Sequence, residues 1–439
     1  MAGAASPAGG LRASLTRAAA RLTTPVGYLG VLGGLQVFLL WVLRERFGIG
    51  LALAASAILV ALLLSLRATP RGWRLKLWGI ALLGVLSAFG PTLSAVLQRP
   101  RIGLTMEHDG LLQLESAVDR LLKGQPIYGV DWSNTPMAAF GWDLTPGPNP
   151  ALHHMAYYPL TVLSGVPFRL LTDGLGVPFD YRLVLVAFGV IGLIAIGLLP
   201  IAAERRFSLI TAVYASPLIT LYLWSGRTDI QFLAMVLVTA VLLSRGHPTL
   251  AAGALGVAVA LKPFAWMAVP FLLLVLAIRW RAGHSRRELV ASLGALALVP
   301  VATILPFFLA NPRAFWTDVV LYTSGGIADA YPIAGYGFGD LLYTLHVITR
   351  RTDRFPFLIF QLAAALPVLW LTARAFLRRP TLARWMAGYA AVLFAFTFFA
   401  RFFNDNYAAV VITLFLFVLP LGNLSLASPP LVTAERLAA

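Results

Sequence analysis

Two carboxylates, Glu107 and Asp109, lie close together in the sequence, directly after a long apolar segment. They open the longest polar stretch of an otherwise strongly apolar chain. A carboxylate held in such a stretch could accept a proton from a substrate hydroxyl, and a positioned general base typically contributes about 10²–10⁴-fold to a rate. The alternative is that these acids only cap a helix or face solvent in a loop.

Three basic residues could stabilise negative charge that develops on a leaving group, because fixed cations near the reacting atoms act in this way. Lys262 lies between two apolar segments, where an unpaired ammonium group is costly. It could equally extend toward water or pair with Asp229. Arg227 could bind a phosphate through two parallel hydrogen bonds, or it could pair with Asp229. Arg401 is the third candidate.

The polar group that starts at Arg401 also contains Asn404, Asn406 and Tyr407 and lies between two apolar segments. Amide and phenol groups could bind phosphate or sugar hydroxyls. Asn and Asp are also common turn formers, so the same residues could form an ordinary hairpin between two helices. We treat them, with Asp229, as candidate ligands of a phosphate or a sugar.

Two adjacent histidines, His153 and His154, precede Tyr158 in the first polar stretch. Neighbouring side chains on regular structure point in different directions. No clear third ligand accompanies them, although closed metal sites usually need three or four ligands, so we expect no metal. The histidines could bind a phosphate or a sugar, or lie at a membrane interface. Tyr158 could stack on a sugar, although aromatic residues also gather at membrane interfaces.

The composition indicates a membrane protein. Hydrophobic residues make up 59% of the 439 residues and charged residues 12%, against about 25% charged residues in a typical soluble domain. The net charge of +16 could suggest a nucleic-acid partner, but the basic residues are scattered between apolar segments, so we expect none. The chain has no cysteine, which excludes disulfides and thiolate metal sites.

Apolar segments approach the roughly 20 residues that are needed to cross a bilayer. We predict an all-α integral membrane protein, a bundle of about twelve transmembrane helices at 26–43, 49–66, 77–97, 181–203, 207–224, 230–244, 249–261, 264–280, 289–310, 356–378, 383–399 and 407–421. The predicted order is a cytoplasmic tail (1–25), N-terminal transmembrane helices (26–97), a first large outer loop (98–180), central transmembrane helices (181–310), a second outer loop (311–355), C-terminal transmembrane helices (356–421) and a cytoplasmic tail (422–439).

Short helices are predicted inside the two outer loops. One ends at the stop signal Gly124-Gln125-Pro126. The apolar piece at 158–171 is too short to span comfortably, so we interpret it as an interfacial or re-entrant helix. Residues 340–349 could form another interfacial helix.

Lys and Arg in the short loops predict the orientation. They fall at 67–76, 205–206, 279–287 and 374–384, all on the side of the N-terminal tail. Positive charge marks cytoplasmic loops, so both termini are predicted to be cytoplasmic and the two long segments to face the outer side. The Ala, Leu, Gly, Arg and Pro bias suggests a bacterium with a GC-rich genome, and hence a multi-pass protein of the bacterial plasma membrane.

Several motifs resemble a known family in their order and topology. Leu121–Tyr128 follows the acidic pair, and Tyr157–Leu160 is similar to a Tyr-Pro-Pro-Leu motif. Ser216-Pro217 and Ser225–Asp229 resemble a Pro…Gly-Gln-x-Asn region. Ala252–Pro263 is similar to the Ala-Gly…Gly…Ala…Lys-Pro signature of the actinobacterial mannosyl- and arabinofuranosyltransferases of family GT87. Taken together, the motifs of this chain resemble those of the polyprenyl-phosphate-sugar-dependent glycosyltransferases of the GT-C superfamily, and this resemblance implies a GT-C-like bundle.

The resemblance covers roughly residues 100–420 and implies that one sugar is transferred, with inversion, on the outer face. It places the general base in the first outer loop, where we favour Asp109 and keep Glu107 as the alternative, and it places Lys262 at the cavity. The implied partners are a polyprenyl-phosphate-linked sugar donor, a glycolipid or polysaccharide acceptor and membrane lipid, with no cofactor. Mannose is the first expectation and arabinofuranose the second. The family's usual Gln-x-Asn is replaced by Arg227-Thr228-Asp229.

The alternative function is a polytopic transporter or lipid flippase. Such a protein should carry polar residues at mid-membrane depth in several helices. Here the predicted spans nearly lack them, polarity collects at the outer ends, and no inverted repeat of the kind common in transporters is evident. A structural scaffold would not explain two long outer segments with clustered acids and aromatics. We therefore expect an enzyme.

Overall fold

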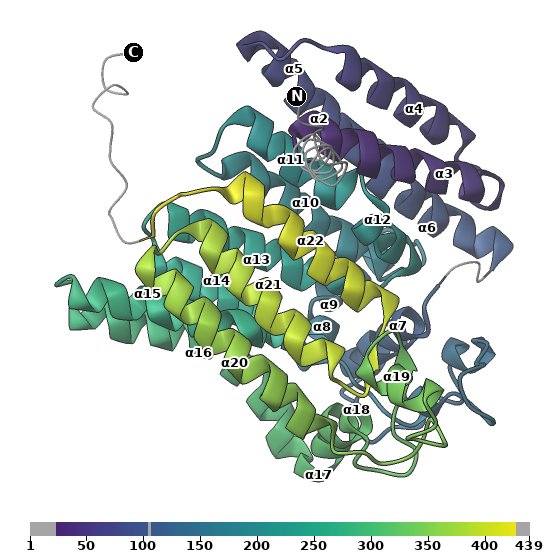
Figure 1. The fold of residues 1–439 in the computed structure, drawn as a ribbon. Helices are drawn as coiled ribbons and strands as arrows, with labels where there is room; N and C mark the ends of the chain where they lie inside the picture. Colours follow the sequence, from purple (N-terminus) through teal and green to yellow (C-terminus); the bar gives the residue numbers. More distant parts are fainter. Residues whose placement is uncertain (1–22, 104–106, 427–439) are drawn as a thin grey trace, which may run out of the picture.

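Helices form almost all of the regular structure in residues 23–103 and 107–426, the parts of the chain that this computed structural model describes (Figure 1). Residues 1–22 and 427–439 of the predicted tails, and residues 104–106 just before Glu107, lie outside the described residues. A short parallel pair of strands, β1 (Ala334–Gly335) and β2 (Phe402–Phe403), joins the second long polar segment to the start of the last helix. The predicted all-α class is confirmed for the described residues.

The N-terminal helices lie together at one edge of the bundle, at the top of Figure 1. They are α2 (Pro25–Tyr28), which continues through the π-turn η1 (Leu29–Gly33) into α3 (Gly34–Phe47), then α4 (Gly50–Ser65), and α5 (Pro70–Gly84), which continues through η2 (Val85–Phe89) into α6 (Gly90–Ile102). Helix α3 packs on α4, and α5 packs on α11 of the central group.

The remaining long helices form the body of the bundle. They are α10 (Arg182–Leu198), α11 (Ala203–Tyr214), α12 (Pro217–Ser225), α13 (Asp229–Ser244), α14 (Pro248–Leu261), η5 (Pro263–Ala268) with α15 (Val269–Arg281), α16 (Arg286–Ala310), α20 (Phe357–Arg378), α21 (Leu382–Phe398) and α22 (Asp405–Leu421). Helix α14 packs between α13 and α16, and α21 packs between α20 and α22. Each of the twelve predicted spans overlaps a helix, or a run of consecutive helices, of the N-terminal group or of the body.

Among residues 23–103 and 107–426, five helical stretches are long and apolar enough to cross a membrane by themselves: Pro25–Glu45, Pro70–Arg101, Pro263–Arg281, Arg286–Ala310 and Phe357–Arg378. The bent pair α11 and α12 would make a sixth. Six further apolar helices in this part of the chain have 10–17 residues, fewer than the roughly 20 residues of a standard span. The protein is therefore a membrane protein, and the number of twelve crossings stays a prediction.

Two predicted spans have different limits in the structure. The span predicted at 207–224 is two helices, bent by 42° between Tyr214 and Pro217. Proline has no N–H and disfavours a helical residue before it, so Ser216 leaves the first helix and caps the second. The span predicted at 77–97 begins at Pro70, because the Thr69 hydroxyl accepts a 3.0 Å hydrogen bond from the Gly72 N–H and caps the helix there.

The helices are connected at two ends of the bundle. One end, which we call the short-loop end, carries the connections 66–69, 199–202, 245–247, 282–285 and 379–381. The first described helix begins at this end and the last one ends there. The two lie in contact, since Tyr28 Oη donates a 2.9 Å hydrogen bond to Leu416 O. The opposite end, which we call the large-loop end, carries residues 107–181 and 311–356.

The large-loop end is built from short elements. They are α7 (Asp109–Leu122), η3 (Pro136–Ala139), η4 (Pro150–Leu152), α8 (Pro159–Leu163), α9 (Val166–Gly174), α17 (Pro312–Trp316), η6 (Thr317–Leu321), α18 (Tyr322–Ser324) and α19 (Phe338–Thr344). Helix α7 ends just before Gly124, whose φ is +67°, so the predicted stop is confirmed. The segment predicted as one helix at 158–171 is divided into α8 and α9, and α8 packs on α14 and α16. The interfacial position of these helices stays a prediction.

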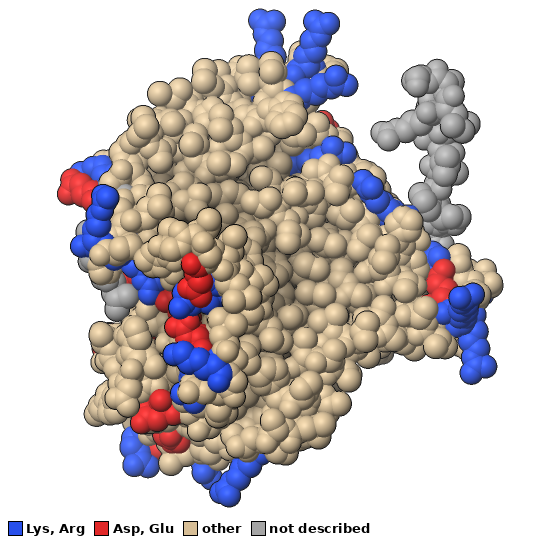
Figure 2. All heavy atoms as spheres, turned by 180° about the vertical axis from the view of Figure 1, so that it is seen from behind, with Lys and Arg blue, Asp and Glu red and all other residues tan. Residues whose placement is uncertain are grey.

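Charge is distributed unevenly over the surface. Figure 2 shows Lys and Arg along the upper and right edges, most of the acidic side chains at the left and lower left, and a broad area with almost no charge between them. Large apolar side chains on α16 and α20 are exposed, for example Leu298 at 66% and Leu366 at 57%. An uncharged, apolar surface of this kind fits a bilayer core.

Candidate active site

Asp109 is the first residue of α7, and contacts with the turn between α12 and α13 determine its position. The His108 N–H donates a 2.8 Å hydrogen bond to Ser225 O. Gly226 has a φ of +86°, and a Cβ there would lie 2.7 Å from Leu111, so this close approach requires glycine. The structure therefore brings Asp109 to the segment that contains Arg227, which is far away in the sequence.

The Asp109 carboxylate is buried and accepts hydrogen bonds at both oxygens. Its Oδ1 accepts a 2.7 Å bond from the Gly110 N–H, and its Oδ2 accepts a 2.8 Å bond from Asn149 Nδ2. His108 Nδ1 lies 2.9 Å from Oδ1. Burial by itself would raise the pKa of Asp109, but His108 and the two hydrogen bonds outweigh burial and hold the pKa well below its usual range. Asp109 is therefore ionised at neutral pH.

Glu107 belongs to a buried ionic network. Its Oε1 lies 3.1 Å from Arg182 Nη2, and the two side chains are 1% and 0% exposed. Arg182 Nη2 also lies 2.7 Å from Asp180, and Asp180 continues the network to Arg99 at 2.9 Å. The network connects the residues just before α7 to the first residue of α10 and to the end of α6.

Arg227, Asp229, Lys262, Asp405 and Asn406 form a second polar group, which we call the basic cluster. Lys262 Nζ lies 2.5 Å from Asp229 Oδ1, and Asn406 Nδ2 donates a 2.7 Å hydrogen bond to Asp229 Oδ2. Arg227 Nη1 lies 2.5 Å from Asp405 Oδ1 and 3.1 Å from Asn406 Oδ1. The pairing of Lys262 with Asp229 that we considered is present, whereas Arg227 pairs with Asp405 and not with Asp229.

Both cations have donors beyond these ion pairs. Arg227 Nε is buried and has no hydrogen-bond partner within residues 23–103 and 107–426. Lys262 Nζ lies 4.9 Å from the ring centre of Phe264 and 5.6 Å from that of Tyr407. An ammonium group has three N–H donors and a guanidinium group has five. Each side chain could therefore bind an additional anion while its ion pair persists.

Tyr157 lies between Asp109 and the basic cluster. Its hydroxyl occupies the space beside Gly110, where a Cβ would come within 1.8 Å of it. Burial raises the pKa of Tyr157, and the negative charges of Asp109 and Asp229 raise it further. Asp109 and the Asp229 carboxylate of the basic cluster therefore both lie close enough to the Tyr157 hydroxyl to act on it.

Arg401 holds the second long segment in place. Its guanidinium donates hydrogen bonds to three backbone carbonyls: to Tyr331 O, to Asp353 O at 2.8 Å and to Arg351 O at 3.0 Å. The side chain is buried, and burial lowers the pKa of Arg401 to about 10. Backbone groups thus occupy donors that we had expected to bind a phosphate.

The other predicted ligands lie near the same region with different contacts. Asn404 Nδ2 lies 3.5 Å from Tyr331 Oη. The Tyr407 ring packs edge-on against Phe264 at 4.5 Å between ring centres. Tyr158 directly precedes α8, is partly buried and hydrogen-bonds through its side chain to Trp266.

His154 joins the two long polar segments. Its Nδ1 lies 2.9 Å from Asp318 Oδ1 and its Nε2 lies 2.8 Å from Asp329 Oδ2. The ring stacks on Tyr322 at 4.7 Å between centres. Burial alone would lower the pKa of His154, but the two carboxylates outweigh burial and raise it. Within residues 23–103 and 107–426, no group of three or more His, Cys, Asp or Glu side chains is arranged to hold a metal ion.

His153, in contrast, is largely exposed. Its side chain is 46% exposed, and its Nδ1 lies 3.5 Å from Asp131. The two neighbouring histidines therefore point to different surroundings, as we expected from their adjacency.

Sequence reasoning missed Arg182, Asn149 and Asp318. The position of Arg182 in the sequence could have indicated an ion pair, because an arginine at the start of an apolar helix needs a partner. Asn149 lies in a Pro- and Gly-rich stretch without periodicity, and Asp318 lies in a short π-turn of the second long segment. The last two could be found only from the tertiary structure.

The model of one protein family, Glycosyltransferase family 87, matches residues 156–400, which is more than half of the chain. The chain belongs to glycosyltransferase family 87. It is a membrane glycosyltransferase, and the predicted resemblance is confirmed. Comparison with curated proteins and with solved structures found no match.

The family 87 match covers only part of the candidate site. Arg227, Asp229 and Lys262 lie inside the matched residues, whereas Asp109 precedes them and Asn406 follows them. Asp109 and Asn406 therefore lie in segments that flank the matched residues.

Proposed function

We propose that this protein transfers a single sugar, with inversion, from a polyprenyl-phosphate donor to a glycolipid or glycan acceptor on the outer face of the membrane. The observation that carries the proposal is that the charges of Asp109, Asp229 and Arg227 all act on the buried Tyr157 hydroxyl, while Asp229 pairs with Lys262. Membership of family 87 supports sugar transfer, and the cations support a phosphate leaving group. Mannose is the first choice and arabinofuranose the second, because the Ala252–Pro263 motif resembles enzymes that transfer these sugars.

Asp109 acts as the general base in this mechanism. The acceptor oxygen forms a bond to the anomeric carbon while the bond from that carbon to the phosphate oxygen breaks. The acceptor proton passes to Asp109, and the phosphate leaves with the bonding electron pair. A lipid phosphate is a good leaving group, so one carboxylate is sufficient. Because its low pKa makes Asp109 a weak base, proton transfer accompanies bond formation, when the acceptor oxygen has become acidic.

Two observations favour Asp109 over Glu107 as the base. The Asp109 side chain is 12% exposed and the Glu107 side chain 1% exposed. Glu107 also lies against Arg182, and removing one partner of a buried ion pair is strongly destabilising. We assign Glu107 a positioning role, in which its ion pair holds the residues that precede Asp109.

Arg227 and Lys262 stabilise the leaving phosphate. Arg227, whose side chain is partly exposed, and Lys262 contribute N–H donors that their ion pairs with Asp405 and Asp229 do not use. Asp229 and Asn406 orient Lys262. We assign Arg401 to holding the second long segment, because backbone carbonyls accept its hydrogen bonds.

The proposed orientation has the large-loop end on the outer side of a bacterial plasma membrane and both termini in the cytoplasm. The scattered Lys and Arg of the short-loop end support it, since such residues mark cytoplasmic loops. The donor tail would lie against the apolar surface in lipid, and the acceptor would enter from the outer aqueous side.

Transfer of labelled mannose tests this proposal. Purified protein in lipid nanodiscs is given polyprenyl-phosphate mannose, labelled in the sugar, and an octyl α-mannoside acceptor. Asp109→Asn is expected to lower the transfer rate by about 10²–10⁴-fold, because it removes the base, while donor binding persists.

Two variants serve as controls for folding and for position. Asp143→Asn changes an exposed acid of the same segment and is expected to keep the wild-type rate. Glu107→Gln, compared at equal folded fraction, is expected to lower the rate less than Asp109→Asn. Transfer at the wild-type rate by folded Asp109→Asn would show that Asp109 is not the base. Absence of transfer from any lipid-phosphate donor would show that the proposed class of donor is wrong.

A further inference from the structure

Two arginines at the short-loop end contact the last carbonyls of α10, and we call them the arginine pair. Arg206 Nε donates a 3.0 Å hydrogen bond to Leu199 O. Arg245 Nη2 donates a 2.8 Å hydrogen bond to Leu198 O. Arg206 lies in the first turn of α11, and Arg245 follows α13, which packs along α10 (Figure 1). Because the accepting carbonyls are neighbours in the chain, the two guanidinium groups lie close together, and the charge of Arg245 acts on Arg206.

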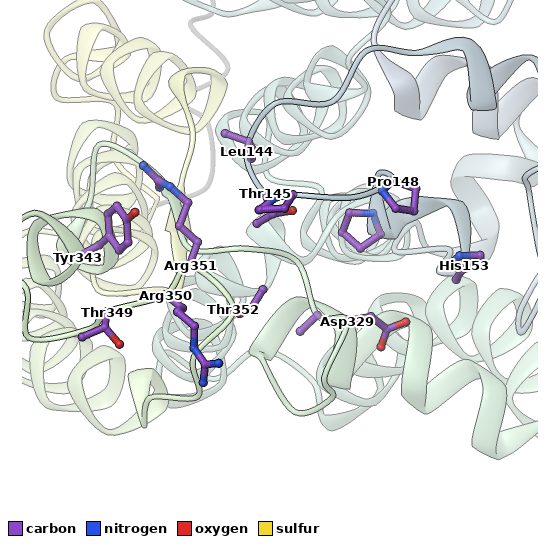
Figure 3. Close-up of a pocket in the computed structure, with 13 residues that line it drawn as sticks. Leu144, Thr145, Pro148, His153, Asp329, Tyr343, Thr349, Arg350, Arg351 and Thr352 are labelled. Atoms are coloured by element: carbon purple, nitrogen blue, oxygen red, sulfur yellow. The ribbon is translucent and has the colours of Figure 1, made fainter.

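The arginine pair has no carboxylate partner within residues 23–103 and 107–426. Arginines at the opposite end of the bundle differ in this respect. A cleft of about 600 Å³ opens there between the two long segments (Figure 3). In its lining, Arg350 Nε lies 3.0 Å from Asp353, and Arg351 Nη1 lies 3.1 Å from Asp340. The arginine pair therefore carries two positive charges that no acidic side chain of the described residues offsets.

Contact with α10 uses only a small part of the donors of the arginine pair. The last carbonyls of a helix have no partner inside the helix and carry partial negative charge, so both arginines stabilise the end of α10. This contact uses one N–H of each guanidinium, which has five. Phosphate oxygens can accept the others, often through two parallel hydrogen bonds. Arg245 is exposed and Arg206 is partly buried, so a ligand can reach both from the surface.

An exposed apolar face of α10 leads to the arginine pair. Ile191, Ile194 and Leu198 are exposed, and their spacing of three and four residues places them on one side of the helix. Leu198 is also the residue whose carbonyl accepts the hydrogen bond from Arg245. The face therefore runs along the helix from the two cations toward the middle of the bundle. An acyl chain attached to a phosphate at the arginine pair would follow the same path.

These features fit a lipid headgroup with a net negative charge. A phosphate between two guanidinium groups that lack an acid is attracted by both, and basic pockets between transmembrane helices are known to bind anionic headgroups. A zwitterionic headgroup brings a cation of its own, which the arginine pair repels. Charge complementarity therefore selects an anionic phospholipid over a zwitterionic one.

We propose that the arginine pair binds the phosphate of an anionic phospholipid, whose acyl chains lie along the exposed face of α10. This inference goes beyond the proposed sugar transfer and does not rest on it, because the site lies at the opposite end of the bundle from Asp109. It requires only that the short-loop end meets the surface of a bilayer.

Lipid binding to the purified, delipidated protein in a neutral detergent tests the inference. Native mass spectrometry gives the Kd of the first bound phosphatidylglycerol and that of phosphatidylcholine with the same acyl chains. We expect phosphatidylglycerol to bind more tightly to the wild type. Arg206→Gln and Arg245→Gln should each raise its Kd about fivefold, as expected for one basic residue near an anionic headgroup. Equal Kd values for the two lipids, or an unchanged Kd in both variants, would overturn the site.

Arg281→Gln is the matched control, because it removes one exposed arginine from the last turn of α15 at the same end of the bundle. It should leave the Kd of phosphatidylglycerol unchanged. A fivefold loss in this variant as well would show that net charge alone attracts the lipid, and it would overturn the site.

The melting temperature gives a second readout and shows that each variant is folded, because a ligand that binds only the folded protein raises it. Phosphatidylglycerol should raise the melting temperature of the wild type more than phosphatidylcholine does. In the variant with both glutamines, the two lipids should give equal shifts. Inorganic phosphate at the same concentration should give none. An equal shift with inorganic phosphate, or tighter binding of a polyprenyl phosphate than of phosphatidylglycerol, would assign the site to another phosphate and overturn the proposal.

Discussion

The Asp109 carboxylate combines two properties that usually oppose each other. It is buried, which favours the neutral acid, yet its pKa is well below the usual range because His108, Asn149 and the Gly110 N–H favour the charged form. The result is a carboxylate that is ready to accept a hydrogen bond from an acceptor hydroxyl over a wide range of pH. Its weak basicity suits a reaction in which the leaving group needs no assistance from an acid.

The acid limb of the pH profile should report the hydrogen bond from Asn149. We expect Asn149→Ser to move the acid limb of kcat/KM to higher pH, because loss of this donor favours protonated Asp109. Serine retains an oxygen that can cap the Ala151 N–H, as Asn149 does now at 3.0 Å. The measurement is kcat/KM against pH for folded protein.

Asn311→Ser is the matched control, because Asn311 caps the Ala314 N–H at 3.0 Å in another segment. It should leave the acid limb unchanged. Profiles of wild type and Asn149→Ser that coincide would show that Asp109 is not the titrating base.

At the scale of elements, a buried ionic network holds the residues that precede α7. Arg182 at the start of α10 contacts Glu107 and Asp180, and its Nη1 donates a 3.2 Å hydrogen bond to Trp224 O at the end of α12. Three elements are thus joined at one guanidinium. Asp109, the first residue of α7, is positioned by this junction together with the bond from the His108 N–H to Ser225 O.

The contact between the two long segments should depend on pH through His154. Its folded pKa is raised above the ordinary value of about 6.5. The stabilisation is therefore fully present below about pH 6.5 and is lost as the pH rises through the folded pKa. We expect the melting temperature of the wild type to fall across this interval, because neutral His154 cannot donate to both Asp318 and Asp329.

Thermal unfolding at a series of pH values measures this effect. His154→Gln is neutral throughout and should show a flatter curve in the same interval. His153→Gln changes the neighbouring histidine, which is 46% exposed, and should retain the wild-type dependence. A wild-type curve as flat as that of His154→Gln would contradict the assigned role of His154.

At the scale of the whole molecule, the two ends of the bundle differ in the length of their connections and in their polar residues. The short-loop end carries compact turns with Arg, and the large-loop end carries most of the acidic residues and the basic cluster. An uncharged surface lies between them. The candidate catalytic and binding residues therefore lie at one end of the bundle.

The absence of cysteine from the sequence allows a direct test of the orientation. Arg354→Cys introduces one thiol at the large-loop end, and Arg71→Cys introduces one at the short-loop end; both side chains are exposed. A membrane-impermeant maleimide should label Arg354→Cys in intact cells and Arg71→Cys only after permeabilisation. The reverse pattern would invert the proposed topology.

Much of the fold could be predicted from local pattern. Apolar runs with Pro, Ser or Thr at their starts determine where helices lie, and each predicted span coincides with a helix or a helix pair. The span at 207–224 is predicted as one helix, whereas the structure divides it at Ser216-Pro217, and the 42° bend depends on how α11 and α12 pack. The division of the predicted helix at 158–171 into α8 and α9 could not be predicted either, because the conformation of a short, weakly apolar segment depends on the elements that pack against it.

The sequence by itself determined that this is a membrane glycosyltransferase of family 87, and it identified the acids and cations at the polar ends of the helices. Helix periodicity and motif order are local properties, so they can be recognised without the fold. Only the tertiary structure decided which charges meet. It paired Lys262 with Asp229, Arg227 with Asp405 and Glu107 with Arg182, because ion pairs between distant residues depend on helix packing and burial, which sequence spacing does not encode.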